Sequence, residues 1–394
     1  MHYQDEMIQK RHYLTFLLAG LLTGTSIPAQ KTKTLKWSVV ATLPKVDSLV
    51  VNPGVAGAFS GVHNNVLIIA GGANFPAGMP WEGGKKMYQD QVYILNEIAG
   101  EKFEWFNEEK YTLKEPVAYG ATVSSPEGII CIGGENDKGA SANVFLIRWD
   151  KANKVLVTDD LPSLPYPLTN LSAVINDNKI FVAGGENING VSDKFLFLDL
   201  KDRASGWKQL PSLPQPVSHA VMLVKSGKNT KTIYIIGGRR KTETGISELY
   251  KNVYEFDLRK NEWQQKGSLP FVLSAATGIV SQKNDLIILG GDKGETFHKV
   301  ELLIAAIGSE TNEAKKQELI LQKNKIQVSH PGFSNEILCY NTANDKWSPA
   351  GVIPFPAAVT TTAVKWKNRI IIPSGEIKAG VRTAQVLMGK MLKK

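Results

Sequence analysis

The chain has 394 residues, 43% of them hydrophobic, and its 35 glycines and 19 prolines are spread along the whole length. This composition excludes a disordered chain and suits one large or two ordinary domains built from many short strands and turns. The net charge of +9 comes from scattered residues without a long basic run, so it favours a solvated positive surface over a nucleic-acid partner and is compatible with an acidic small molecule.

The N-terminal residues have the pattern of a secretory signal peptide. A basic segment, QKRH, precedes twelve mostly apolar residues, YLTFLLAGLLTG, which are followed by the small-residue stretch TSIPAQ. The apolar run is too short to span a bilayer comfortably. We expect residues 1–29 to be removed after Ala29, with Met7 as an alternative start, and residues 30–394 to be periplasmic or secreted without a membrane span.

A short phrase then recurs along the chain, in which a strand-like apolar run ends in a glycine pair. The copies are VLIIAGG, IICIGG, IFVAGG, IYIIGG, LIILGG and a weaker RIIIPSG. The pairs start at residues 71, 133, 184, 237, 290 and 374, which are 62, 51, 53, 53 and 84 residues apart. A period near fifty is typical of kelch propeller blades, so internal repeats dominate the chain.

Each repeat continues in the same way. After the glycine pair come a polar loop and an alternating strand, such as KFLFLDL or NVYEFDL, and then a tryptophan before a Leu-Pro turn, as at Trp207, Trp263 and Trp347. A strand of small residues follows, which suits the crowded innermost strand of a blade. The repeats resemble the kelch family of β-propellers over nearly the whole chain after residue 29.

Strand counting predicts an all-β, six-bladed propeller that is a single domain over residues 30–394. The last repeat offers only three strands, within residues 357–366, 369–375 and 383–389. Residues 35–43, LKWSVVATL, have the form of a fourth strand without a blade of their own. We therefore expect this N-terminal strand to complete the last blade and close the ring.

Two other features interrupt the repeats. The fifth unit has an insertion at about residues 298–333, which we expect to be helical, with Thr311 as a helix cap, and to act as a lid or as a decoration. The two cysteines, Cys131 and Cys339, lie in strands of non-adjacent units. Two buried thiols are therefore favoured over a disulfide, and neither has metal-ligand spacing.

The loops that follow each second strand should meet those that enter each first strand at one mouth of the central channel. Sites are expected there, on loops held by a rigid scaffold. The first set offers Asn74, Glu135, Asn136, Glu186, Asn187, Arg239, Arg240, Asp292, Lys293 and Glu376. The second offers Asn52, Tyr119, Asn170, His219 and Ser274, and Glu82, Lys85 and Lys86 lie in the first unit's loop. These residues suit a polar, hydroxylated ligand, although each one could simply bond its own loop.

One of these loops has a more specific pattern. Residues 374–383, SGEIKAGVRT, resemble the loop of the bacterial sialic acid mutarotases, kelch-type N-acetylneuraminate epimerases in which a Glu and an Arg in the pattern G-E-x-K-x-G-x-R-T are proposed at the active site. Residues 54–75, 81–95 and 118–135 resemble the same family. In ordinary members the Glu–Arg loop precedes those segments, and here it follows them, so the chain is similar to the cyclically permuted branch.

The resemblance implies an isomerase that interconverts the anomers of a sialic acid through its open-chain ketone, without a cofactor or metal. It implies that Glu376 is an acid/base group and that Arg382 clamps the sugar's carboxylate or stabilises a developing oxyanion. Substrate contacts are expected from Asn74, Tyr119, Glu135, Glu186 and Arg239. The sequence departs from the family at Val117, where an arginine is frequent, which allows a related ulosonic acid as substrate or binding without turnover.

Two other interpretations remain open from the residues. A non-catalytic kelch module would bind a glycan or a protein through the same mouth, and Glu376 and Arg382 would then form only a surface ion pair. Copper oxidase chemistry would need Tyr and His ligands, and the six scattered histidines do not assemble into such a set.

Overall fold

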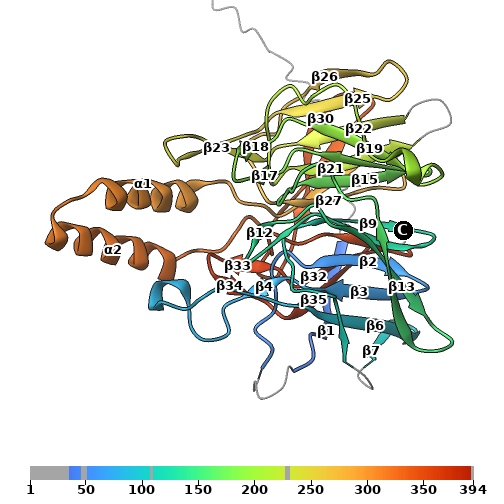
Figure 1. Cartoon of the computed structure of the whole chain (residues 1–394), viewed down its shortest axis with the longest axis horizontal. Coiled ribbons are helices and arrows are strands. Elements are labelled where there is room, and N and C mark those ends of the chain that lie inside the picture. The colour runs from blue at the N-terminus through green and yellow to red at the C-terminus, as the bar shows by residue number, and fades with distance from the viewer. Residues whose placement is uncertain (1–34, 46–50, 107–109, 227–230, 392–394) are drawn as a thin grey trace, which may run out of the picture. The chain divides into compact units, whose positions relative to one another are not determined.

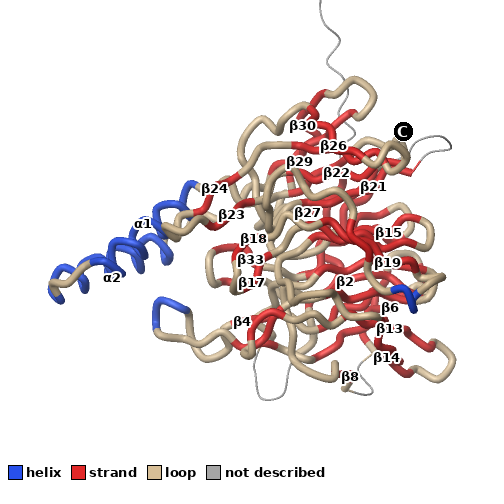
Figure 2. Tube along the Cα trace, turned by 45° about the horizontal axis from the view of Figure 1, so that its top comes forward, coloured by secondary structure: helices blue, strands red, loops and turns tan. Residues whose placement is uncertain are grey.

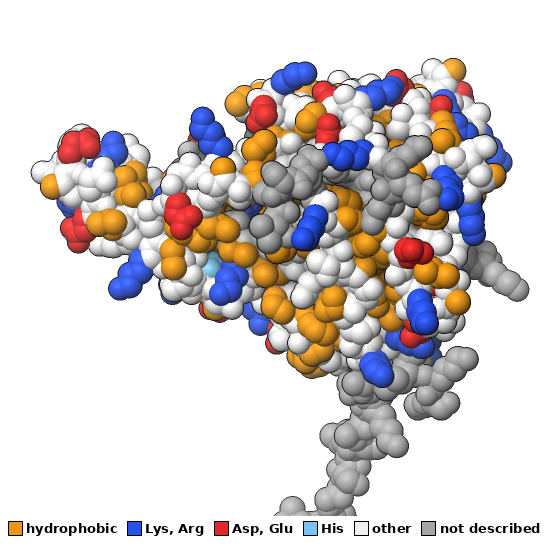
Figure 3. All heavy atoms as spheres, turned by 90° about the horizontal axis from the view of Figure 1, so that it is seen from below, with side chains coloured by type: hydrophobic (Ala, Val, Ile, Leu, Met, Phe, Trp, Pro, Cys, Tyr) orange, Lys and Arg blue, Asp and Glu red, His pale blue; other side chains and the backbone are white. Residues whose placement is uncertain are grey.

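The computed structural model describes residues 35–45, 51–106, 110–226 and 231–391. The expected signal peptide, residues 1–29, lies outside the described residues. No helix in the described ranges is long and apolar enough to cross a membrane. On the face shown in Figure 3, Lys and Arg side chains are dispersed among hydrophobic and acidic ones.

Six antiparallel sheets of four main strands follow one another and form the blades of a β-propeller (Figure 1). Blade 1 contains β2 (Phe59–His63), β3 (Val66–Ala70), β6 (Gln91–Ala99) and β7 (Lys102–Trp105), with β8 (Tyr111–Thr112) paired to β6. Blade 2 contains β9 (Ala121–Ser125), β10 (Gly128–Ile132), β13 (Val144–Asp150) and β14 (Val155–Leu161). Blade 3 contains β15 (Ser172–Asn176), β16 (Lys179–Ala183), β19 (Phe195–Asp199) and β20 (Lys208–Gln209).

The remaining blades repeat this up-and-down order. Blade 4 contains β21 (Val221–Ser226), β22 (Lys231–Ile236), β25 (Val253–Asp257) and β26 (Glu262–Lys266). Blade 5 contains β27 (Thr277–Val280), β28 (Leu286–Leu289), β29 (Glu336–Asn341) and β30 (Lys346–Val352). Blade 6 contains β31 (Val364–Trp366), β32 (Arg369–Pro373), β35 (Gln385–Met391) and, from the other end of the chain, β1 (Leu35–Thr42). The six-bladed fold expected from the repeats is confirmed.

The closure of the last blade by the N-terminal strand is also confirmed. Strand β1 pairs antiparallel with β35, and Trp37 lies opposite Gly389. A Cβ atom on Gly389 would come within 3.0 Å of the Trp37 ring, so a glycine is needed where the indole crosses the neighbouring strand. The pairing covers the outer edge of β35, which an open sheet would leave exposed to aggregation.

The tryptophans before the Leu-Pro turns join neighbouring blades, as expected. Each indole Nε1 donates to a backbone carbonyl of the preceding blade's outer segment, from Trp207 to Pro162 O at 2.8 Å, from Trp263 to Pro211 O at 3.0 Å and from Trp347 to Gly267 O at 2.8 Å. Trp105 makes the same bond to Thr42 O at 2.9 Å. In these four blades a half-buried indole therefore both fills space and sets the register between blades.

The glycine pairs mark the turns where the chain leaves each second strand. Gly71 has φ of 66°, and a Cβ there would lie 2.4 Å from Val117 O of the next blade's entering loop. In the weaker sixth copy Ser374 takes the same conformation, with φ of 55°. Its hydroxyl accepts from Val55 N at 2.9 Å and lies 2.6 Å from Thr383 O, so local hydrogen bonds support a conformation that is unfavourable for a serine.

Five of the turns continue as two-stranded hairpins on one side of the propeller. The hairpins are β4 (Ala73–Asn74) with β5 (Met87–Tyr88), β11 (Glu135–Asn136) with β12 (Gly139–Ala140), β17 (Glu186–Asn187) with β18 (Gly190–Val191), β23 (Arg239–Lys241) with β24 (Ser247–Leu249), and β33 (Glu376–Lys378) with β34 (Val381–Arg382). Two short 3₁₀ helices, η1 (Pro80–Glu82) and η2 (Arg203–Ser205), lie in loops of blades 1 and 3.

In blade 5 a helical hairpin replaces the sixth of these β-hairpins, which confirms the expected helical insertion. Helices α1 (Glu295–Ser309) and α2 (Glu313–Val328) project away from the blades on the side that carries β23 and β33 (Figure 2). The expected cap at Thr311 is wrong by one residue, because the Asn312 side chain accepts from Lys315 N at 3.0 Å and asparagine caps at least as well. Cys131 and Cys339 are free thiols in blades 2 and 5.

Candidate functional site

Six equivalent positions, one from each blade, form the inner row of the mouth. Each follows a glycine pair, or Ser374 and Gly375 in blade 6, and makes a backbone bridge to the loop that enters the same blade's first strand. The positions are Ala73, Glu135, Glu186, Arg239, Asp292 and Glu376. Since side chains alternate along a strand, the next residue turns away from this row, and Asn136 and Asn187 donate to the backbone of Pro116 and Pro167.

A closed ring of six backbone hydrogen bonds lies directly inside this row. Each member donates its N–H to the carbonyl of the member in the preceding blade, at distances from 2.7 to 3.4 Å. The members are Gly57, Tyr119, Asn170, His219, Ala275 and Thr360, and all have φ between 48° and 69°. Five of the six are not glycine, so backbone strain is concentrated around the propeller axis, where it fixes the direction of the Tyr119, Asn170 and His219 side chains.

The channel beside this ring is narrow and lined by small residues. Its volume is about 150 Å³, and its walls come from the starts of the innermost strands, with Ala121, Ser172, Ala220, Thr277 and Thr361 among them. The expectation of small residues on the innermost strands is confirmed. The channel is smaller than most small-molecule pockets, so the wider mouth above it is the more suitable place for a ligand.

Glu376 and Arg382 lie side by side across the β33–β34 hairpin. One oxygen of the Glu376 carboxylate accepts from Gly380 N at 2.7 Å, and the other lies 3.6 Å from Nη2 of Arg382. The side chain of Glu376 is 18% exposed, whereas that of Arg382 is only 5% exposed. The hairpin thus presents a carboxylate to the mouth and keeps its counter-ion beneath it.

Arg382 reaches from blade 6 into the space beside blade 1. Its Nε donates to Ala73 O at 3.3 Å, Nη2 donates to the Tyr119 hydroxyl at 3.3 Å, and the guanidinium carbon lies 4.6 Å from the centre of the Phe75 ring. Ala73 has the smallest side chain of the inner row, which leaves room for the guanidinium. Burial raises the pKa of Tyr119 to about 12 although Arg382 opposes the shift, so this hydroxyl stays protonated.

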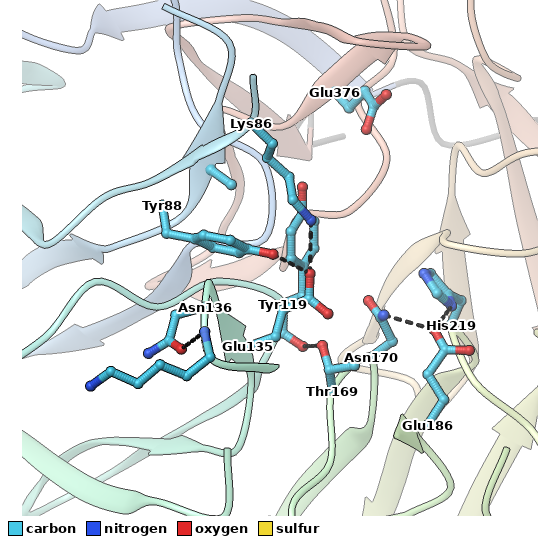
Figure 4. A network of polar contacts seen from close by, with 12 residues as sticks. Lys86, Tyr88, Tyr119, Glu135, Asn136, Thr169, Asn170, Glu186, His219 and Glu376 are labelled. Atoms are coloured by element: carbon cyan, nitrogen blue, oxygen red, sulfur yellow. Dashed lines mark hydrogen bonds and ion pairs between the residues drawn. The ribbon is translucent and has the colours of Figure 1, made fainter. Parts of the chain in front are cut away.

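A second carboxylate, Glu135, is held by two residues of blade 1 (Figure 4). Its Oε1 accepts from Nζ of Lys86 at 2.9 Å and from the Tyr88 hydroxyl at 2.7 Å. Burial and the hydrogen bond to Glu135 raise the pKa of Tyr88 far above its usual value, so its hydroxyl remains a donor. The Lys86 ammonium also lies 4.7 Å from the centre of the Tyr88 ring and 5.2 Å from that of Tyr119.

Blades 3 and 4 supply a separate polar cluster, seen at the right of Figure 4. The carboxylate of Glu186 accepts from Asn170 Nδ2 at 2.8 Å and from the Ser218 hydroxyl at 3.3 Å. His219 lies 3.8 Å from the same carboxylate through Nδ1, and its Nε2 lies 3.2 Å from Nη2 of Arg239. A guanidinium only donates, so Nε2 accepts and the proton of the neutral ring is on Nδ1.

Arg239 is the buried centre of this cluster. Its pKa is lowered by burial, and the charges of Glu186, Glu301, Asp292 and Glu376 oppose that shift. Burial, and then the charge of Arg239, hold the pKa of His219 well below its usual value, so the imidazole is neutral.

The helical hairpin touches the mouth at its base. Phe297 of α1 covers Arg239, with the guanidinium carbon 4.5 Å from the ring centre. The carboxylate of Glu301 accepts from Ser247 N at 2.9 Å and from its hydroxyl at 2.7 Å, which attaches α1 to blade 4. On the other side, Asn324 of α2 donates to Trp81 O at 3.2 Å. The insertion thus bridges loops of blades 4 and 1.

The structure brings together six of the seven residues that the sequence placed at the site. Tyr119, Glu135, Glu186, Arg239, Glu376 and Arg382 all border the mouth. Asn74 instead points away and is buried, donating to Gly54 O at 2.9 Å and accepting from Gln89. Val117, which occupies the position where the family frequently has an arginine, packs in the core between blades 1 and 2.

Sequence reasoning missed three contributors to the site. Tyr88 and Phe75 lie in the blade 1 loop, and Phe297 comes from the insertion. The spacing of Lys86, just before β5, and Tyr88, within it, is a signal that was available for the first of these, because residues two apart in an extended segment share a face and both bond to Glu135. Among the described residues no group of three or more His, Cys, Asp or Glu side chains is arranged to hold a metal ion.

Comparison with known proteins agrees with the resemblance of the Glu–Arg loop. Residues 17–157 and 161–394 match a family model described as N-acetylneuraminate epimerase. Proteins of that name from Yersinia pestis (strain Pestoides F) and Haemophilus influenzae (strain PittEE) are 28% and 29% identical over 237 and 239 residues, 59% of this chain in both cases. One from Salmonella typhimurium is 25% identical over 225 residues. The aligned part spans 58%, 60% and 56% of these relatives' own lengths.

Proposed function

The chain belongs to the N-acetylneuraminate epimerase family, and we propose that it is an isomerase that interconverts the α and β anomers of N-acetylneuraminate or a related sialic acid. The observation that carries the proposal is the Glu376–Arg382 pair at the mouth, in which an accessible carboxylate lies 3.6 Å from a buried guanidinium. A carboxylate held in this way is a base that a ligand can reach.

The chemistry needs two proton transfers and no cofactor. Opening of the sugar ring removes the proton of the anomeric hydroxyl and delivers one to the ring oxygen, and closure onto the other face of the ketone reverses both transfers. In our proposal the Glu376 carboxylate takes the anomeric proton, and the carboxylic acid so formed delivers it to the ring oxygen; closure onto the other face runs the same two transfers in reverse. The adjacent Arg382 compensates the charge on Glu376 and on the oxygen that becomes negative.

Burial favours one of the two roles that the sequence left open for Arg382. Its side chain is 5% exposed, and Nε and Nη2 are already bonded to Ala73 O and to Tyr119. The remaining Nη1 has no hydrogen-bond partner among the described residues, but it is buried, so no pair of adjacent N–H groups is open to the mouth for a bidentate carboxylate clamp. We therefore assign Arg382 to electrostatic support of Glu376.

The other half of the mouth suits the hydroxylated part of the sugar. Asn170, Glu186 and His219 present an amide, a carboxylate and a neutral imidazole, and all three are held by hydrogen bonds to one another or to Ser218 and Arg239. Such preorganised donors and acceptors recognise sugar hydroxyls without an ordering cost at binding.

The test is proton NMR of N-acetylneuraminate freshly released as its α anomer, at a pH where spontaneous conversion is slow. The wild-type protein should accelerate the conversion to the β anomer. Glu376→Gln should lose at least about a hundredfold of this acceleration while keeping most of the sugar affinity, because the amide cannot take a proton. Glu248→Gln, which changes a half-exposed carboxylate on the β23–β24 hairpin, is the matched control and should keep full activity.

Two results would contradict the proposal. Sugar binding without any acceleration would identify a non-catalytic binding module. Acceleration that survives in Glu376→Gln would move the base elsewhere in the mouth.

We also propose that the protein is exported. The support is the pattern of residues 1–29, in which a basic segment, a short apolar run and small residues precede Gln30. Fractionation of cells that express the full chain should recover the protein outside the cytoplasm with Gln30 as its first residue. An intact N-terminus in the cytoplasmic fraction would refute export.

A further inference from the structure

Lys86 differs from the two buried arginines of the mouth, Arg382 and Arg239. Arg382 is almost wholly buried beneath Glu376, and Arg239 is buried under Phe297 among carboxylates. The side chain of Lys86 keeps 35% of its surface exposed. It is therefore a cation that a ligand can reach from the mouth without displacing a neighbouring blade.

The surroundings of Lys86 fix its position without saturating it. The ammonium has three N–H groups, and in the described part of the chain its one hydrogen-bond partner is Oε1 of Glu135. The rings of Tyr88 and Tyr119 lie 4.7 and 5.2 Å away and remove water from the ammonium on two sides. Tyr88 also donates to the same oxygen of Glu135, so it keeps the carboxylate directed at Lys86.

Tyr119 places Lys86 close to the proposed base. Its ring lies 5.2 Å from the Lys86 ammonium, and its hydroxyl accepts from Arg382, the partner of Glu376. In a sialic acid the carboxylate and the anomeric hydroxyl are attached to the same carbon atom. The group that holds the carboxylate must therefore lie close to the base, and Tyr119 connects Lys86 to the Glu376–Arg382 pair.

We propose that Lys86 binds the carboxylate of the sugar-acid substrate, with Glu135 and Tyr88 as positioning residues. This inference rests on the proposed function, because it assigns the anionic end of the same substrate. Two N–H groups of the ammonium point to the ligand while the third remains on Glu135. The second oxygen of Glu135 is then free to accept from a neighbouring sugar hydroxyl.

The experiment uses isothermal titration calorimetry to compare two ligands, N-acetylneuraminate and its methyl ester, in which a methyl group neutralises the carboxylate and the rest of the sugar is unchanged. Lys86→Met should weaken binding of the acid by about 10- to 100-fold, as expected for a lost hydrogen bond to a charged group, and change binding of the ester less than about twofold. Lys138→Met, on an 86% exposed lysine of the neighbouring β11–β12 hairpin, should change neither. Lys86→Arg keeps the charge and should recover part of the loss.

A positioning role for Tyr88 has its own readout. Tyr88→Phe keeps the ring and removes the hydroxyl that holds Glu135, so the acid should bind about threefold to tenfold more weakly with the ester unaffected. Equal weakening of both ligands by Lys86→Met, or no weakening of the acid, would overturn the assignment, as would a wild-type protein that does not bind the acid. Because calorimetry needs no turnover, a loss confined to the acid supports Lys86 even if NMR shows no mutarotation.

Discussion

The two halves of the mouth use the same scaffold positions for opposite purposes. In the half formed by blades 6, 1 and 2, the accessible groups are Glu376, Glu135 and Lys86, and the buried guanidinium of Arg382 supports them from below. In the half formed by blades 3 and 4, the guanidinium of Arg239 is itself the centre, and carboxylates surround it.

This difference shows that equivalent positions of the inner row can have different roles in the two halves. A single small residue, Ala73, leaves the space in which Arg382 reaches the first half from the neighbouring blade. In the second half, Glu186 and Arg239 occupy the inner row. Glu186 accepts from Asn170 and Arg239 bonds to His219, and both partners belong to the ring of backbone hydrogen bonds. We expect proton transfer and the recognition of negative charge in the first half, and rigid recognition of hydroxyls in the second.

The largest expected effect comes from removing the centre of the second half. Arg239→Met removes a buried guanidinium that donates to His219 and whose charge is stabilised by nearby carboxylates, so we expect a loss of about 3 kcal/mol in the free energy of unfolding, as for a lost hydrogen bond to a charged group. Urea unfolding at neutral pH measures it. Arg240→Met is the control, because that neighbouring residue forms a half-exposed pair with Glu248 that contributes less than about 1 kcal/mol. Equal losses in the two variants would show that Arg239 is not a structural centre.

A substitution in the first half should lower activity and not stability. Arg382→Met is expected to lower kcat/KM of the proposed mutarotation by about a hundredfold, mainly through kcat, because it removes charge stabilisation next to Glu376. NMR of anomer conversion at several sugar concentrations separates kcat from KM. Lys378→Met, on the exposed side of the same hairpin, should leave both unchanged. A rise in KM with an unchanged kcat would instead indicate that Arg382 binds the carboxylate of the sugar.

A smaller effect is expected on ligand binding, where the acid and its methyl ester distinguish the two halves by their response to ligand charge. Glu186→Gln removes an acceptor for sugar hydroxyls, so we expect the acid and its methyl ester to bind about tenfold more weakly and by equal factors. Lys86→Met is expected to discriminate between the two ligands. Discrimination by Glu186→Gln, measured by the same calorimetry, would contradict the assignment of hydroxyl recognition to blades 3 and 4.

The fold was predictable because its signals are local and repeated. Each glycine pair marks the end of a blade's second strand, and each tryptophan before Leu-Pro marks a contact with the preceding blade. The spare strand at residues 35–43 predicts how the ring closes. Alternation after the glycine pair explains why Glu135 and Glu186 face the mouth, whereas Asn136 and Asn187 bond to loops.

The rest of the site depends on contacts between repeats, which no single repeat contains. The ring of six backbone hydrogen bonds needs positive φ at residues as different as Tyr119, His219 and Thr360, and their sequence carries no common signal for it. Likewise, Phe297 reaches Arg239 from an insertion in another blade. Asn74 was placed at the site because it follows a glycine pair, yet it is one residue beyond the inward position, which is Ala73.

The smallest expected effect is the pH dependence of the free energy of unfolding that arises from the neutral His219 in the second half. Because burial holds the pKa of His219 well below 6.5, the unfolded chain binds a proton as the pH falls through 6.5 and the native protein does not. Stability is therefore fully present above pH 6.5 and falls below it, by at most about 1.4 kcal/mol per pH unit from this residue. In His219→Asn, urea unfolding between pH 7 and pH 5 should show a slope reduced by that amount. Asparagine suits the position, since Asn170 has φ of 53° in the same ring. An unchanged slope would mean that the imidazole is protonated in the native protein, which would place a second cation beside Arg239 and remove the distinction between the two halves.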